Sequence, residues 1–145
     1  MEEEKATYKL GVALSGGGAK GFAHLGVLDA LNEKGLYPEV IAGTSAGAFA
    51  GALYADGYTP KEIKAFFQKK VFREFAEFAI PHGGFFKSEG FRLFLKKHLR
   101  AKHFEDLKIP LRVVATDIEY GESHVFTTGT LIPAVIASCS VPIIF

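Results

Sequence analysis

Short apolar runs alternate with a helical pattern along the first third of the chain. Residues 10–14 form an apolar run that is typical of a strand buried on both faces, and a glycine-rich loop follows it. Apolar residues then recur at helical spacing from Phe22 to Leu31, and Gly35 is a typical helix stop. A second apolar run begins at Val40. This order predicts a strand–helix–strand unit, which requires parallel strands and a right-handed crossover.

Helix and strand patterns continue to the end of the chain. Thr59-Pro60-Lys61-Glu62 has the features of a helix N-terminus, and Ser88 is expected to cap another helix that runs through Leu99. The remaining predicted elements are helices from 46 to about 56, from 61 to 104 with a break at 80–84 and from 133 to 138, and strands at 111–118 and 123–127. The pattern predicts an α/β fold in which functional loops lie at the carboxyl ends of parallel strands.

Size and composition indicate a globular protein. With 145 residues, 48% hydrophobic and 23% charged, the chain suits a single domain with a substantial core. A net charge of +1 gives no reason to expect a nucleic-acid partner. Cys139 is the single cysteine, so the chain can form no internal disulfide.

The two ends of the chain carry separate signals. Residues 1–5 are acidic and lack the basic and apolar regions of a signal peptide. The longest uncharged stretch, 40–55, is shorter than the ~20 residues that a membrane-spanning helix needs. These features predict a soluble, cytoplasmic protein. The chain stops in the apolar run 140–145 without a polar tail, and we therefore expect a domain that is incomplete at its C-terminus.

The segment Gly43-Thr44-Ser45-Ala46-Gly47 matches the G-x-S-x-G pattern, in which a serine occupies a sharp strand-to-helix turn. Composition alone predicts roughly 0.07 chance matches in this chain. Glycines two positions before and after the serine allow strand and helix to pass closely. The N-terminus of the following helix favours developing negative charge. The pattern therefore predicts that Ser45 is a nucleophile.

The glycine loop at residues 15–21 has several interpretations. Its G-x-G-x-x-G spacing resembles a dinucleotide-binding fingerprint, but Gly43-Thr44-Ser45 stands where the ribose-binding acid would be required. Lys20 is followed by Gly21, so the phosphate-binding G-K-[ST] pattern is missing. An anion-binding nest that acts as an oxyanion hole fits better. A plain tight turn is the structural alternative.

Three segments together closely resemble the patatin-like phospholipases of bacterial type: residues 15–21, 43–47 and 137–142. The resemblance implies one domain over residues 1–145 with a three-layer α/β/α fold and a mainly parallel central sheet. It further implies a Ser–Asp dyad that hydrolyses acyl esters of lipids and needs no metal or other cofactor. The residues that it implies are Ser45 as nucleophile, Gly16, Gly17 and Gly18 as the oxyanion hole, and Lys20, Gly21, Gly43 and Gly47 as supporting motif positions.

The catalytic base is the point of departure from the family. The catalytic aspartate of the family belongs to an Asp-Gly-Gly or Asp-Gly-Ala motif. Neither motif occurs among the 145 residues of this chain. The one Asp-Gly pair, Asp56-Gly57, lies at a predicted helix end. We assign no base and expect the aspartate beyond Phe145. A Ser45–Asp117–His124 triad is a weak alternative, because Asp117 and His124 are expected to face each other across a hairpin as a surface pair.

Residues 61–104 are both aromatic and basic. They hold 10 of the 14 phenylalanines, and their 11 Lys and Arg against 4 Asp and Glu give a local charge near +7. In one interpretation Phe66, Phe67, Phe91, Phe94 and Leu95 pack the core while Lys64, Lys69, Lys96 and Lys97 face solvent. In the other, some of Phe72, Phe75, Phe78, Phe85 and Phe86 form a lid or acyl-chain groove that meets anionic lipid at a membrane surface.

Other chemistry-bearing residues give weaker signals. His82, His98 and His103 share no metal-ligand spacing, so no zinc site is predicted. His24 is expected to pack or face solvent, and Cys139 to be a small buried residue. The leading hypothesis is thus a serine acyl hydrolase with a lipid or acyl-ester substrate and peripheral membrane contact. Its rivals are a non-catalytic lipid- or acyl-binding regulator and, third, a nucleotide-binding protein.

Overall fold

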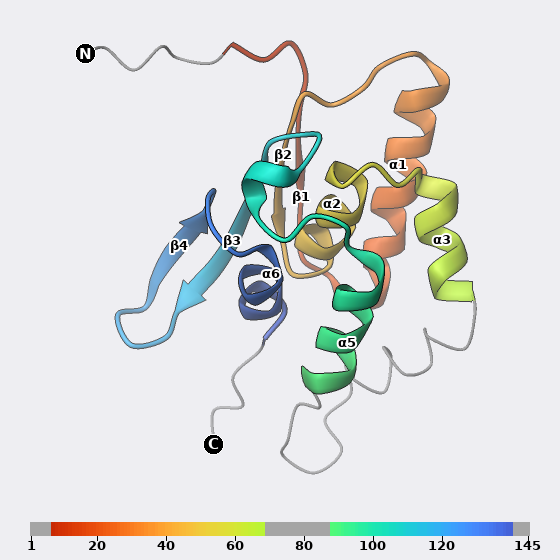
Figure 1. Ribbon diagram of the computed structural model, residues 1–145. Helices are drawn as coiled ribbons and strands as arrows, with labels where there is room; N and C mark the ends of the chain where they lie inside the picture. The colour runs from red at the N-terminus through yellow and green to blue at the C-terminus, as the bar shows by residue number, and fades with distance from the viewer. Residues whose placement is uncertain (1–6, 69–87, 141–145) are drawn as a thin grey trace.

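The computed structural model describes residues 7–68 and 88–140, whose helices and strands are shown in Figure 1. The strands are β1 (Gly11–Leu14), β2 (Val40–Thr44), β3 (Leu111–Asp117) and β4 (Glu122–Phe126). The helices are α1 (Phe22–Glu33), α2 (Ala46–Ala55), α3 (Pro60–Gln68), α5 (Ser88–His98) and α6 (Leu131–Cys139), with 3₁₀ turns η1 (Gly18–Gly21) and η2 (Phe104–Asp106). The helical pattern predicted from 61 to 104 corresponds to α3, α5 and η2 in the described residues.

The four strands form one sheet in the order β1-β2-β3-β4. The first three are parallel, and β4 pairs antiparallel with β3 through a hairpin. The predicted α/β class with a mainly parallel sheet is therefore confirmed. Leu14, the last residue of β1, pairs with Gly43 near the end of β2. The loops that follow these two strands consequently leave the sheet at the same edge.

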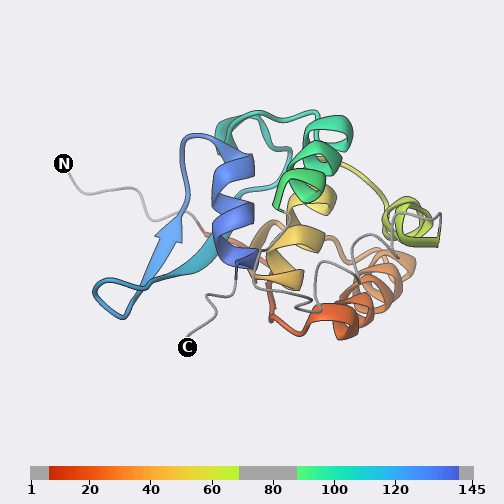
Figure 2. The same cartoon turned by 90° about the horizontal axis from the view of Figure 1, so that it is seen from below.

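Helices α2 and α6 cover one face of the sheet. Helix α2 contacts the three parallel strands, and α6 lies on β3. Figure 2 shows α6, α2 and α5 next to one another, with α1 and α3 on the side of α2 away from β4. Side chains of β3 alternate accordingly: Leu111 and Val113 are buried under the helices, whereas Arg112 and Thr116 are exposed.

Helix α2 is the centre of the core. All its residues from Gly47 to Ala55 are buried, and most of them are alanine or glycine. Small side chains let the helix axis approach the sheet closely. A β-carbon built at Gly51 would lie only 3.1 Å from Ile41 Cγ2 and 3.2 Å from Leu111 Cδ1. This close packing holds the middle of α2 against the first residues of β2 and β3.

Two predicted helix boundaries are confirmed by their geometry. Gly35, with φ +72°, follows the end of α1 in a conformation that side chains disfavour. At the start of α3, the N–H of Glu62 donates to Thr59 Oγ1 at 3.2 Å, and the N–H of Thr59 donates to Glu62 Oε2 at 2.8 Å. These reciprocal bonds form the capping box that the sequence predicts. The N–H of Thr59, and secondly the Thr59 hydroxyl, which donates to Glu62 Oε2 at 2.9 Å, hold the pKa of Glu62 below its usual value.

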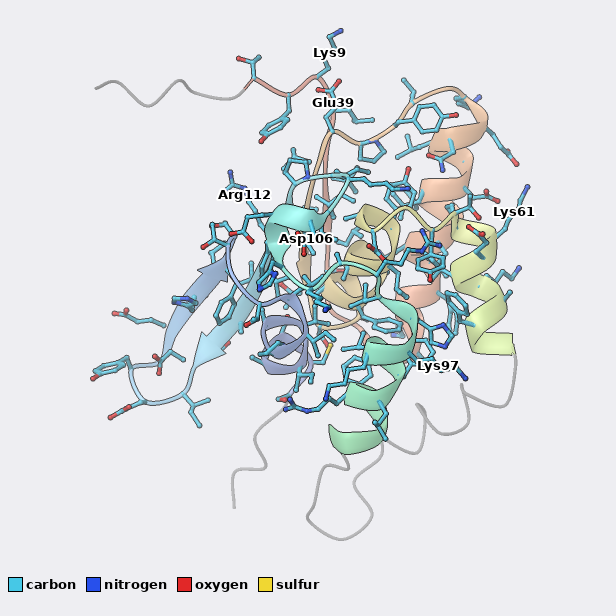
Figure 3. The ribbon with its side chains drawn as sticks, in the orientation of Figure 1. Lys9, Glu39, Lys61, Lys97, Asp106 and Arg112 are labelled. Carbon is cyan, nitrogen blue, oxygen red and sulfur yellow. The ribbon has the colours of Figure 1, made fainter. Side chains whose placement is uncertain are left out.

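The described part of the aromatic and basic segment contributes mainly to the core. Phe91 and Leu95 are buried, and Phe66 and Phe94 pack against the same cluster. Of the residues that the two interpretations name, those that lie outside the described side chains are Phe67, Lys69, Phe72, Phe75, Phe78, Phe85 and Phe86. The exposed lysines include Lys61, which extends outward from α3 in Figure 3. Within residues 7–68 and 88–140, no helix has the length and apolar character needed to cross a membrane.

Candidate active site

Ser45 forms the turn between β2 and α2. Its backbone has φ 52° and ψ −118°, and it is the one non-glycine residue with positive φ in the part of the chain that the structure describes. Its carbonyl accepts the N–H of Phe49 at 3.0 Å, the first hydrogen bond of α2. The residue is partly exposed. The sharp strand-to-helix turn predicted for the G-x-S-x-G segment is therefore present, with its strain concentrated at the serine.

The glycines on either side of Ser45 permit two close backbone approaches. A β-carbon at Gly43 would lie 2.5 Å from the carbonyl oxygen of Gly47. A β-carbon at Gly47 would overlap the carbonyl of Leu14 and lie 2.7 Å from that of Ser15. Any larger residue at Gly47 would thus push the start of α2 away from the end of β1. Glycine is required here by space.

The glycine loop passes directly beside Ser45. A β-carbon built at Gly16 would lie 3.4 Å from the β-carbon of Ser45, and one at Gly21 would lie 2.6 Å from that of Ala46. The loop is closed by a bond from the N–H of Lys20 to the carbonyl of Gly17 at 3.0 Å. Lys20 itself is exposed. Ser45 and the loop from Gly16 to Gly21 are therefore neighbours, and their catalytic roles stay predictions.

A polar side chain from α6 also reaches the turn. Ser138 Oγ accepts the N–H of Ser45 at 2.8 Å and donates to the carbonyl of Val114 at 2.6 Å. Sequence reasoning assigned no role to Ser138. The signal that could have drawn attention to it is its place in residues 137–142, the third segment of the family resemblance.

The next residue of α6 contacts the other side of the same serine. Cys139 Sγ lies 3.4 Å from the Ser45 carbonyl, to which it donates. Burial raises the pKa of the Cys139 thiol to about 12, so the sulfur is protonated at neutral pH. Cys139 is partly buried, so the expectation of a small buried residue is confirmed only in part. A protonated thiol is a donor and a poor nucleophile.

His24 supports the glycine loop, a contact that the sequence interpretation missed. Its Nε2 lies 2.8 Å from the carbonyl oxygen of Ser15, the residue that begins the loop. Because a carbonyl only accepts, Nε2 must carry the proton of this bond. The expectation that His24 packs or faces solvent is thus incomplete. Local periodicity places His24 on α1, but it does not show that α1 turns this ring back toward residue 15.

The alternative triad is not assembled. In the hairpin register, Asp117 pairs with Glu122, and His124 pairs with Ala115, so the expected placement of Asp117 opposite His124 is wrong by two residues. Asp117 Oδ1 instead accepts the N–H groups of Glu119 and Tyr120 and closes the hairpin turn. The His124 ring packs against Phe126.

The other titratable residues considered from the sequence have structural contacts. Asp56 is buried, and its carboxylate accepts the N–H groups of Arg100 at 2.8 Å and Ala101 at 3.0 Å. His98 packs against Phe66 and Phe94, with ring centroids 4.4 Å apart in each pair. Among residues 7–68 and 88–140, no three His, Cys, Asp or Glu side chains gather in a way that could hold a metal ion. His82 lies outside that part of the chain.

Fold and site together define an α/β protein in which a serine forms the sharp turn between a parallel strand and a helix. The family model of the patatin-like phospholipases matches residues 12–145. A patatin-like phospholipase domain-containing protein of Caenorhabditis elegans is 33% identical over 130 residues, which cover 84% of this chain and 10% of that protein. The chain belongs to the patatin-like phospholipase family.

Further comparisons agree with this assignment. An NTE family protein of Mycobacterium bovis is 34% identical over 137 residues, which cover 92% of this chain and 38% of that protein. Full-length ExoU of Pseudomonas aeruginosa, solved in complex with SpcU, has a similar fold, with a TM-score of 0.63 and 21% identity over 92% of this chain and 38% of that one. The chain thus spans about a tenth to two fifths of the length of these relatives.

Proposed function

We propose that the protein containing this chain is a serine acyl hydrolase of phospholipase or lysophospholipase type, with Ser45 as its nucleophile. Membership of the family supports hydrolysis of lipid esters in general. The observation that carries the finer proposal is the strained turn at Ser45 with Gly16 against its β-carbon. A hydroxyl and a row of main-chain amides then border the same small space, as acyl transfer requires.

The reaction follows from these neighbours. Ser45 Oγ attacks the ester carbonyl carbon, and the carbonyl π electrons move to its oxygen, which the amides of Gly16, Gly17 and Gly18 stabilise. In this proposal the serine proton passes to an aspartate of the full-length protein, which we expect beyond residue 145. Collapse of the intermediate expels the alcohol, which takes that proton, and leaves an acyl-enzyme. Water then attacks the acyl-enzyme, so that the fatty acid is released and Ser45 regains its proton.

The start of α2 supports the same charge distribution. Ser45 precedes the first turn of this 10-residue helix, whose N-terminus carries partial positive charge. The exposed glycines of the loop leave room for a substrate carbonyl. For the amides of Gly16, Gly17 and Gly18, no hydrogen-bond acceptor is found within residues 7–68 and 88–140. Unpaired donors beside a nucleophile are what an oxyanion hole needs, and each is typically worth ~10²–10³ in turnover.

A fluorophosphonate probe tests the assignment in the full-length protein. Ser45 Oγ should form a bond to phosphorus as fluoride leaves, and mass spectrometry should find the adduct on the peptide that contains Ser45. Ser45→Ala should abolish both the adduct and esterase activity. Ser123→Ala, which alters an exposed serine of β4, should retain both. Full esterase activity in Ser45→Ala, or no adduct in the wild-type protein, would refute the proposal.

We also propose peripheral contact with anionic membranes through α5. Leu93 is 56% exposed on this helix, and the exposed Lys96 and Lys97 follow it by three and four residues, so the three share one face. An apolar side chain beside cations suits the interface of an anionic bilayer. Sedimentation with phosphatidylserine vesicles should exceed that with phosphatidylcholine, and Lys96→Glu/Lys97→Glu should remove the difference. Vesicle binding without ester turnover would instead favour a lipid-binding regulator.

A further inference from the structure

The ladder between β2 and β3 would, if continued, pass through Ser45. The N–H of Ile41 donates to the carbonyl of Pro110 at 3.0 Å. In a parallel ladder, every second residue of one strand makes such a bond, and the acceptor advances by two residues as well. Two steps further along, the same rule would join the N–H of Ser45 directly to the carbonyl of Val114.

The hydroxyl of Ser138 stands between those two groups. It accepts the N–H of Ser45 at 2.8 Å and donates to the carbonyl of Val114 at 2.6 Å. The side chain therefore replaces the direct bond with a bridge of two. This lets the chain leave the sheet at Ser45 while both backbone groups remain paired. A bridge of this kind needs a group that donates and accepts at once, which a hydroxyl does and a methyl does not.

Helix α6 holds the carbonyl side of the same residue through Cys139, whose Sγ donates to the Ser45 carbonyl at 3.4 Å. Two consecutive residues of one helix thus contact the N–H and the C=O of Ser45. That residue has φ 52°, a conformation that non-glycine residues rarely adopt and that persists only where its surroundings enforce it. The two contacts from α6 help to hold Ser45 in this conformation.

We propose that Ser138 is a positioning residue for the Ser45 hydroxyl, and that its two hydrogen bonds set the reaction rate of Ser45 rather than the affinity for substrate. The inference rests on the proposed function. Ser138 is buried and bonded to the backbone on the sheet side of the turn, so it acts through Ser45. A displacement of a nucleophile by about 1 Å can cost ~10²-fold in rate.

The test compares Ser138→Ala with Ser138→Cys in the full-length protein. Ser138→Ala should lower the maximal rate of fluorophosphonate labelling about 10- to 100-fold, with an unchanged half-saturating probe concentration. Ser138→Cys keeps the connectivity of the side chain and supplies a larger atom that is a weak donor and acceptor, so it should fall between Ser138→Ala and wild type. Ser140→Ala is the matched control, because Ser140 Oγ donates to the Ile136 carbonyl in the same segment. It should label at the wild-type rate.

A second measurement separates this inference from the proposed function. NMR hydrogen exchange of the Ser45 amide should be at least about 10-fold faster in Ser138→Ala and Ser138→Cys than in wild type, since its acceptor is lost or weakened. Unchanged Ser45 exchange in both variants would overturn the bridge. If each reactive molecule of Ser138→Ala and Ser138→Cys labelled at the wild-type rate, the positioning role would be overturned, even if a smaller fraction of the molecules reacted. A wild-type protein that does not label at all would refute the proposed function, and with it the effect on rate, while exchange still decides the bridge.

Discussion

At each end of helix α2, a buried polar side chain forms hydrogen bonds with backbone groups, but the two ends serve different purposes. At its N-terminus Ser138 bonds to the backbone of Ser45, and at its C-terminus Asp56 accepts the N–H groups of Arg100 and Ala101. In the described part of the chain, Asp56 and Ser138 are the two polar side chains that are buried. Both side chains join an end of α2 to a segment distant in sequence. The backbone conformation at the two ends of the helix is different.

The difference lies in the conformation at each end. Ser45 has φ 52°, whereas Asp56 has φ −73° and ψ −9°, an ordinary helical conformation. Ser45 is partly exposed next to the glycine loop, and Asp56 is 4% exposed. We infer that the N-terminal end keeps a strained residue in place for chemistry, whereas the C-terminal end contributes stability. Four substitutions can break or sharpen this comparison.

Gly47→Ala should have the largest effect on stability. Its β-carbon would overlap the Leu14 carbonyl, and backbone on both sides must move. We expect a loss of about 3 kcal/mol in the free energy of unfolding, measured by urea denaturation. Gly26→Ala is the control: a β-carbon at this exposed position of α1 meets nothing within 4 Å. Gly26→Ala should raise the free energy of unfolding by about 0.5–1 kcal/mol. If Gly47→Ala lowered it by no more than about 1 kcal/mol, the turn at Ser45 would be loosely packed.

Asp56→Asn should come next. The side chain keeps its shape, but one oxygen that accepts a backbone N–H is replaced by a second donor. We expect about 2 kcal/mol of destabilisation in thermal or urea unfolding, with the labelling rate of Ser45 per folded molecule unchanged. Asp117→Asn, which alters an exposed carboxylate that also accepts two N–H groups, should cost less than about 1 kcal/mol. A slower labelling rate in Asp56→Asn would mean that the two ends of α2 are not separable.

Ser45→Gly should change stability in the opposite direction. Glycine adopts positive φ without steric cost, so the substitution should raise the free energy of unfolding by about 1 kcal/mol while abolishing labelling. Thr44→Gly, in the regular strand β2 one residue earlier, should lower it by about 0.5–1 kcal/mol. Calorimetry on both variants decides the matter. Destabilisation by Ser45→Gly would contradict the claim that Ser45 is held under strain.

The comparison also separates what the sequence could predict from what it could not. The turn at Ser45 was predictable, because an apolar strand, two spaced glycines and an alanine-rich helix are local signals. The capping box at Thr59 and Glu62 is local in the same sense. The strands and helices of the core follow from hydrophobic runs bounded by glycine, proline or a cap.

The contacts that hold the site were not predictable in this way. Ser138 and Ser45 are 93 residues apart, and their bond depends on how α6 packs on β3. His24 contacts Ser15 because of the angle at which α1 leaves the loop. Asp117 was expected opposite His124, but a hairpin register depends on its turn, and this one pairs Asp117 with Glu122. Hydrophobic periodicity encodes none of these relations.

The smallest predicted effect concerns pH and the C-terminal end of α2. Tyr58, two residues after Asp56, donates through its hydroxyl to the His98 carbonyl at 2.6 Å, and the guanidinium of Arg100 lies over the Tyr58 ring. Burial against Phe66 and Phe94, and secondarily the charge of Lys97, lower the pKa of His98 below its usual 6.5. The folded state therefore favours the neutral ring.

The sign of the effect follows from which state binds the proton more readily. Below pH 6.5 the unfolded chain takes up a proton that folded His98 resists, so stability is complete above that pH and declines as the pH falls. Solvent screening limits the loss to about 0.5 kcal/mol. In urea titrations between pH 7.5 and 5, His98→Gln should remove this decline, and Lys97→Gln should remove a smaller part of it. If stability instead rose as the pH fell, and His98→Gln removed that rise, the pKa of His98 would be raised on folding and not lowered. The aromatic packing at this end of α2 would then favour the charged ring.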